Sequence, residues 1–144
     1  MWQTDLSLVR ERLLLVDDDS NLLAILKRYA EMFTLDADTA TNGREAVELL
    51  AKNEYGVVIT DMVMPEMDGM ELIQHIREFH PQCDVLVISG YSGQYGFSDL
   101  ISAGATDFIG KPFERDELQA KLQRIFRERR LIAELYKAKV EAEM

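Results

Sequence analysis

Short apolar runs alternate along the chain with longer segments in which apolar side chains recur at helical spacing. The apolar runs lie at 13–16, 35–40, 57–60, 84–88 and 107–110. Helical spacing recurs between and after them, at about 20–32, from 43 to about 50, at 70–79, at 98–104 and from 114 onwards. This alternation is typical of βα units wound around a parallel sheet, so it predicts an α/β fold.

Reactive side chains follow four of the five apolar runs. Asp17 and Asp18 come after the first run and Asp61 after the third. Ser89 ends the fourth run, and Lys111 follows the fifth. Because the carboxyl ends of parallel strands meet at one edge of an open sheet, we expect these side chains to converge there. Crowded carboxylates need protonation or a cation, and their hard oxygens suit Mg²⁺. A hydroxyl and an ammonium beside them suit a phosphoryl group transferred to a carboxylate nucleophile.

Composition narrows the class of protein. A chain of 144 residues with 47% hydrophobic residues can bury one core, so we expect one domain at 12–126, an extension at 1–11 and a helical extension at 127–144. The net charge of -10 argues against direct binding of nucleic acid. The single cysteine, Cys83, excludes an internal disulfide and a zinc site of paired thiolates. There is neither an apolar run near the roughly 20 residues of a membrane span nor a signal peptide, so a cytoplasmic protein without membrane contact is expected.

Four motifs, in this order, resemble those of the CheY-like receiver domains of bacterial two-component response regulators. They are LLVDDD at 14–19, ITDMVMPEMDG at 59–69, ISG at 88–90 and KPF at 111–113. Each motif alone has a plain explanation, such as helix capping by the aspartates or turn formation at Asp68 and Gly69. Their combination, each at the end of an expected strand, carries the resemblance. It covers about residues 12–126 and implies a flavodoxin-like, doubly wound sheet of five parallel strands in the order 2-1-3-4-5.

The resemblance also implies a chemistry at the acidic side chains. A histidine kinase, or a phosphotransfer protein, would phosphorylate Asp61 with Mg²⁺ as cofactor. Asp17, Asp18, Asp61 and the backbone carbonyl of Val63 would hold the metal, with Asp17 acting through a bound water. Val63 and Tyr91 occupy the positions that tune hydrolysis of the acyl phosphate, and their apolar or bulky side chains predict slow self-dephosphorylation. Such a protein is a phosphorelay switch that takes part in its own phosphotransfer, and it is not expected to be an enzyme.

Further residues would bind the phosphoryl group and transmit the signal. By the same resemblance, Ser89 and Lys111 would each contact a phosphoryl oxygen, and the small Gly90 would leave the group access. Phe108 matches the aromatic switch position, and the bond before Pro112 would be cis. The face formed by the fourth helix, the fifth strand and the fifth helix would then change its packing and control an output that the sequence does not name.

The final helical segment departs from the family pattern because it continues to the last residue. Leu118, Leu122 and Ile125 form a four-three seam that Ile132 and Tyr136 continue. Arg129 interrupts this seam. Two interpretations remain open: a dimerising or output-coupling helix, which would make the protein a homodimer or link it to an effector, and a solvated helix that frays.

Other classes of function fit the residues less well. A small phosphatase with an aspartate nucleophile would need a second carboxylate two residues after Asp61, where Val63 stands. A flavin-binding module of this fold would need a phosphate loop after the first strand, and the acidic Asp17 would repel a phosphate there. A pseudo-receiver that only binds proteins is the remaining alternative, although the complete set of acidic, hydroxyl and lysine side chains gives no reason to prefer it.

Overall fold

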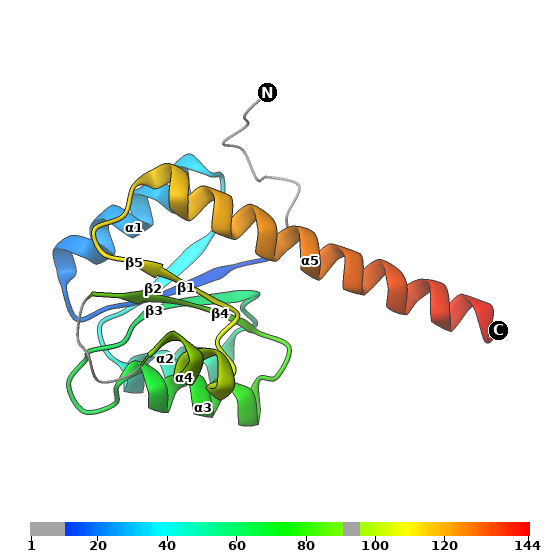
Figure 1. Ribbon diagram of the computed structural model, residues 1–144, viewed down its shortest axis with the longest axis horizontal. Helices are drawn as coiled ribbons and strands as arrows, with labels where there is room; N and C mark the ends of the chain where they lie inside the picture. Colours follow the sequence, from blue (N-terminus) through cyan, green and yellow to red (C-terminus); the bar gives the residue numbers. More distant parts are fainter. Residues whose placement is uncertain (1–10, 91–95) are drawn as a thin grey trace.

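The computed structural model describes residues 11–90 and 96–144, which form three layers around a central parallel sheet (Figure 1). The five strands lie in the order β2-β1-β3-β4-β5. Their bounds are β1 (Leu13–Val16), β2 (Ala37–Ala40), β3 (Val57–Asp61), β4 (Asp84–Ser89) and β5 (Asp107–Gly110). All four strand pairings are parallel. The predicted flavodoxin-like, doubly wound topology is confirmed.

Helices cover both faces of the sheet. Their bounds are α1 (Ser20–Met32), α2 (Gly43–Lys52), α3 (Gly69–Phe79), α4 (Phe97–Ala103) and α5 (Arg115–Ala142). Side chains of α1 and α5 share one apolar cluster with Leu13 and Leu15, whereas α2, α3 and α4 share another with Leu14 and Val16. Successive side chains of a strand point to opposite faces, so a sheet covered on both sides needs strands that are apolar throughout.

One strand begins later than the apolar pattern predicted. The prediction started the second strand at Leu35, but β2 begins at Ala37. Thr34 has a φ of 63°, and the Leu35 N–H donates to the Ala30 carbonyl at 2.9 Å, so these residues close the end of α1. Leu35 is buried because it packs under that turn, not because it lies in the sheet.

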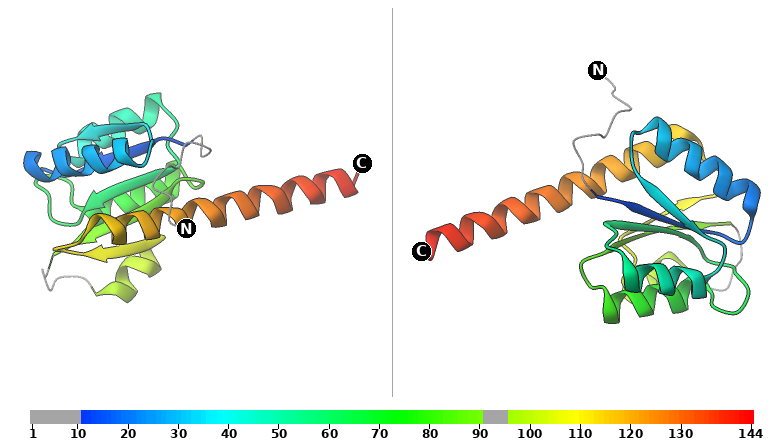
Figure 2. Two further views of the ribbon diagram at one scale, coloured as in Figure 1. Left: turned by 90° about the horizontal axis from the view of Figure 1, so that it is seen from above. Right: turned by 180° about the vertical axis from the view of Figure 1, so that it is seen from behind.

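The last helix continues well past the sheet (Figure 2). Its first turns bury Leu118, Leu122, Ile125 and Phe126 against the sheet, whereas Leu131, Ile132, Leu135 and Tyr136 are exposed. Arg129 lies where the helix leaves the domain. None of the helices in the described ranges combines the length and apolar character needed to cross a bilayer.

Arg129 joins α5 to the start of the sheet. Its guanidinium donates to both carboxylate oxygens of Glu11, to Asp84 at 2.8 Å and to the Gln82 carbonyl at 2.7 Å. We call these four residues the Arg129 cluster. The residue that interrupts the apolar seam of α5 is therefore a polar contact between the helix and the amino ends of β1 and β4.

Candidate functional site

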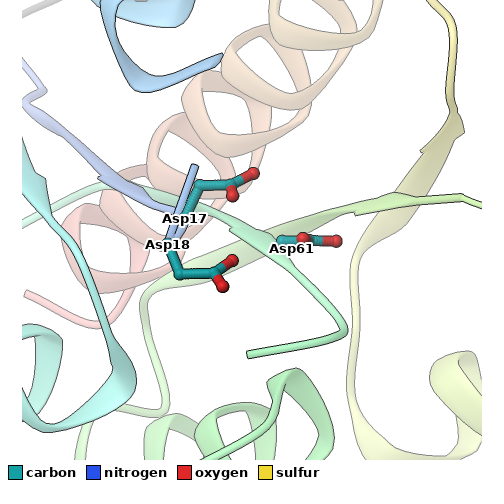
Figure 3. A group of neighbouring side chains, drawn as sticks. All are labelled: Asp17, Asp18 and Asp61. Atoms are coloured by element: carbon teal, nitrogen blue, oxygen red, sulfur yellow. The ribbon is translucent and has the colours of Figure 1, made fainter. Parts of the chain in front are cut away.

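Three carboxylates meet at the carboxyl edge of the sheet. Asp17 and Asp18 directly follow β1, and Asp61 is the last residue of the neighbouring β3 (Figure 3). One oxygen atom from each of the three residues lies within 4.8 Å of the others. Asp17 is 1% exposed and Asp61 8% exposed, whereas Asp18 is open to solvent. Two of the three negative charges are thus withdrawn from bulk water.

Backbone N–H groups fix the orientation of these side chains. Asp17 accepts the Asp19 N–H at 2.9 Å through Oδ1. Asp19 caps α1 by accepting the Asn21 N–H at 2.9 Å. Asp61 accepts the Met62 N–H at 2.8 Å through its own Oδ1. Asp19 is therefore the N-cap of α1, whereas Asp17 and Asp18 belong to the carboxylate cluster.

Lys111 brings a positive charge to the buried carboxylates. Its Nζ lies 3.2 Å from Asp61 Oδ2 and 3.8 Å from Asp17 Oδ2. The Lys111 N–H donates to the Ser89 carbonyl at 2.9 Å, which aligns the loop after β5 with the end of β4. The peptide bond between Lys111 and Pro112 is cis. The ammonium, the hydroxyl residue and the carboxylates therefore share one edge of the sheet.

Burial and neighbouring charge disfavour the ionised form of Asp17. Burial is the largest cause that raises the pKa of Asp17, and the charges of Asp61 and Asp18 add to it. The Asp19 N–H and the Lys111 ammonium act in the opposite direction. Asp17 Oδ2 is buried without a hydrogen-bond partner. An unsatisfied carboxylate oxygen beside two further carboxylates is a donor set that suits a hard divalent cation, so these residues fit Mg²⁺.

Gly69 permits the close packing of α3 against the end of β3. Its N–H donates to the Met62 carbonyl at 2.9 Å. A Cβ at this position would lie 2.7 Å from the Asp61 carbonyl oxygen, closer than real contacts allow. Asp68 and Glu71 form a capping box at the same helix start. The Asp-Gly pair, which the sequence identified only as a loop signal, thus positions the backbone of Asp61.

The remaining candidate residues lie near the cluster with different degrees of exposure. Ser89 Oγ donates to the Gly90 carbonyl at 2.9 Å. A Cβ at Gly90 would lie 3.9 Å from the Lys111 side chain, an ordinary contact distance. Phe108 is half-buried, and the Val63 side chain is 62% exposed. The other position expected to tune hydrolysis, Tyr91, lies outside the described residues.

Comparison with known proteins gives the family. The response regulator receiver domain family matches residues 13–123 of the chain. The chain belongs to this family. It is the receiver domain of a two-component response regulator, and its acidic cluster occupies the carboxyl edge described above. Receiver domains are signalling switches and are generally not classed as enzymes.

Individual relatives resemble this receiver domain over most of its length. The transcriptional regulatory protein SrrA of Staphylococcus aureus is 31% identical over 115 residues, which are 80% of this chain and 47% of that protein. The chain thus spans about half the length of the curated relatives it matches. A crystal structure of an adenylate cyclase from Rhodopirellula baltica superposes with a TM-score of 0.81 at 29% identity, covering 93% of this chain and 98% of that one.

A further solved structure holds a metal. The response regulator protein TrrA of Thermotoga maritima, in complex with Mg²⁺ and BeF, superposes with a TM-score of 0.73 at 33% identity. The match covers 80% of this chain and 98% of that chain. Both proteins share the receiver fold, and in this chain the three clustered carboxylates can bind a metal ion.

A broad groove lies at the opposite edge of the sheet. Its volume is about 1080 Å³, and Glu11, Tyr55 and Arg129 are among its lining residues. These residues precede or flank the amino ends of the strands, whereas the acidic cluster follows the carboxyl ends. The groove is therefore separate from the acidic cluster of the receiver domain. Within it, Arg129 is hydrogen-bonded to Glu11, Gln82 and Asp84.

Proposed function

We propose that the receiver domain accepts a phosphoryl group on Asp61 from a partner histidine kinase and acts as a phosphorylation-controlled switch. The observation that carries the proposal is the position of the Lys111 ammonium, 3.2 Å from the Asp61 carboxylate, beside Asp17 and Asp18. This arrangement supplies a nucleophile and a counter-charge at one solvent-facing edge. Membership of the family implies a histidine kinase partner and an output domain.

In the proposed step, an Asp61 carboxylate oxygen attacks the phosphorus of a phosphohistidine on the kinase. A P–O bond forms while the P–N bond breaks, and the electron pair of that bond returns to the imidazole ring, which takes up a proton from solvent. Lys111 offsets the negative charge that accumulates between the carboxylate and the phosphoryl oxygens. The hydrogen bond from the Met62 N–H holds the other Asp61 oxygen in place during attack.

Mg²⁺, when bound, would neutralise charge on the phosphoryl oxygens and orient them for in-line transfer. Asp18, Asp61 and the backbone carbonyl of Val63 are the proposed ligands, with Asp17 acting through a water. The different burial of the two aspartates supports these different roles. Asp17 is buried with its Oδ2 unsatisfied, whereas the Asp18 carboxylate opens to solvent.

We propose that Ser89 and Lys111 each bind one phosphoryl oxygen once the acyl phosphate has formed. Ser89 then exchanges its hydrogen bond with the Gly90 carbonyl for one with the phosphoryl group. Gly90 leaves the group access because it has no side chain. Movement of Ser89 frees space for Phe108, and the face formed by α4, β5 and α5 shifts between two packings.

The acyl phosphate is proposed to be long-lived. Val63 carries no group that can act as a base for an attacking water, and its exposed side chain lies two residues beyond the acceptor. Tyr91, two residues after Ser89 in the sequence, is likewise no base for water and is bulky. A half-life of only seconds, unaltered when both residues are replaced by small polar ones, would contradict this part of the proposal.

The proposed domain boundaries follow the expectation from the sequence. Residues 12–126 form the receiver domain, 1–11 precede it and 127–144 continue α5 as an output-coupling or dimerising helix. The exposed apolar residues on that extension, Leu131, Ile132, Leu135 and Tyr136, support a contact role.

The experiment that tests the function is intact-mass analysis after incubation with acetyl phosphate. We expect a single phosphoryl adduct that requires Mg²⁺ and is lost in Asp61→Asn. Asp36→Asn, at an exposed aspartate directly before β2, is the matched control and should retain the adduct. No adduct under any condition would reduce the chain to a pseudo-receiver that acts only through protein contacts.

A further inference from the structure

An aromatic pair connects α4 to the proposed switch residue. The rings of Phe97 and Phe108 are stacked, with centroids 3.7 Å apart and an interplanar angle of 7°. Phe97 is the first residue of α4 and is 55% exposed, so its position does not result from burial in the core. The contact joins the start of α4 to the middle of β5.

Among the described residues, few contacts hold the first turn of α4. The helix has 7 residues, and Leu100 is its buried side chain. Its N-cap residue is Gly96, which has no side chain to accept a hydrogen bond, although the Gly96 N–H donates to the Asp99 carboxylate at 2.9 Å. Helices of this length are unstable without tertiary contacts. The stack on Phe108 therefore adds to the burial of Leu100 and to the Gly96–Asp99 hydrogen bond in holding this turn.

Phe108 is held from the side of α5 as well. The Lys121 ammonium lies 5.6 Å from its ring centroid, and Lys121 also binds the buried Asp107 at 3.1 Å. The Phe108 N–H donates to Asp107 at 2.8 Å. The hydrogen bond to Asp107 restrains the Phe108 backbone, whereas Lys121 and Phe97 contact its ring. The Phe97 ring stacks on that of Phe108 with centroids 3.7 Å apart, so a rotation of Phe108 about its side-chain bonds would break this stack.

We infer that Phe97 is a positioning residue that holds Phe108 in its half-exposed position and thereby opposes the switch. This inference rests on the proposed function. When Phe108 moves inward after phosphorylation, the stack is lost and the first turn of α4 is released. Phosphorylation must then supply the free energy of the broken stack. Removing Phe97 therefore raises, before phosphorylation, the population of the state in which Phe108 has moved inward and which phosphorylation favours.

The test compares Phe97→Ala with Phe79→Ala in the full chain. Phe79 is a matched control because it is 60% exposed on α3 and packs on the His75 ring at 4.8 Å, away from Phe108. The initial rate of Mg²⁺-dependent adduct formation with acetyl phosphate is measured by intact mass. We expect Phe97→Ala to react about two- to tenfold faster than wild type, as loss of one aromatic pair predicts, and Phe79→Ala to react at the wild-type rate.

A second measurement reports on the stack without phosphorylation. Amide hydrogen exchange across residues 97–103 should be faster in Phe97→Ala than in wild type, and Phe97→Leu should lie between the two. A merely structural role would destabilise α4 without raising the reaction rate. An unchanged or slower rate in Phe97→Ala, with wild type phosphorylated normally, overturns the inference and leaves the proposed function intact. Failure of wild type to form an adduct overturns both.

Discussion

The Lys111 ammonium lies 3.2 Å from the Asp61 carboxylate although β4 separates the strands that carry the two residues. Lys111 reaches across the end of β4 because its own N–H is bonded to the Ser89 carbonyl at 2.9 Å. The same ammonium lies 3.8 Å from Asp17. A single cation therefore lies close to both buried carboxylates and relieves part of the repulsion between them.

Replacing Lys111 by Met should separate metal binding from phosphotransfer. Loss of the positive charge leaves a more negative site, so Mg²⁺ should bind more tightly, by at least about fivefold, because a unit charge about 4 Å away is worth about 1 kcal/mol even in bulk water. Adduct formation with acetyl phosphate should nevertheless slow, because the positive charge that attracts the incoming phosphoryl group is missing. Calorimetric Mg²⁺ titration and intact-mass kinetics measure the two effects. Lys137→Met, on the exposed part of α5, should change neither. Unaltered Mg²⁺ affinity in Lys111→Met would show that the ammonium does not compete with the metal.

Replacing Arg129 by Met should destabilise the fold. The substitution leaves the carboxylates of Glu11 and Asp84 without their partner, and both are partly buried. Breaking a fully buried pair costs about 3–5 kcal/mol, and partial exposure reduces the expected loss here to about 1–3 kcal/mol. Urea denaturation gives the free energy of unfolding. Arg130→Met is the matched control because Arg130 is exposed, and it should stay within about 0.5 kcal/mol of wild type.

Shortened chains test the same contact from another direction. A chain that ends after Phe126 lacks Arg129, whereas one that ends after Arg130 retains it. We expect the longer of the two to approach the stability of the full chain and the shorter to match Arg129→Met. Equal stability of the two shortened chains would mean that the Arg129 cluster contributes nothing to folding.

Alkaline pH should destabilise the protein through Cys83. The thiol is 5% exposed, and burial raises its pKa to about 11. The ordinary thiol pKa is about 8.5, so above that pH the unfolded chain loses its proton while the folded protein keeps it. The free energy of unfolding should therefore fall as the pH rises from about 8.5 towards 11. Urea titrations across this range, compared with Cys83→Ala, should show a shallower pH dependence in the variant. Parallel slopes for the two proteins would count against a titrating thiol.

The sequence predicted those features that depend on short-range signals. Apolar strands followed at once by reactive side chains located Asp17, Asp61 and Lys111, and the parallel sheet places them at a common edge. The start of β2 was predicted too early because an apolar residue such as Leu35 can be buried either in a strand or in the turn that closes a helix. Residue propensities and apolar spacing describe only residues that are close along the chain, so they locate an element better than its exact first residue.

Contacts between distant segments could not be predicted in this way. Arg129 appeared only as a break in an apolar seam, because its partners Glu11 and Asp84 are 118 and 45 residues away along the chain. Phe97 lay just outside the helical segment expected at 98–104, whereas α4 begins with it. Its stack on Phe108 depends on how α4 lies over β5, which no local pattern specifies. Tertiary placement decided both roles.

The unbroken course of α5 gives the molecule a lever. The helix extends 13 residues beyond Arg129, from there to Ala142, which corresponds to about 20 Å at the rise of an α-helix. With the Arg129 cluster as its fulcrum, a tilt of about 10° at the sheet would displace the far end by about 3.5 Å, given that helix length. A repacking of side chains too small to alter the fold would thus become a movement as wide as an atom, at a distance from the site where it began.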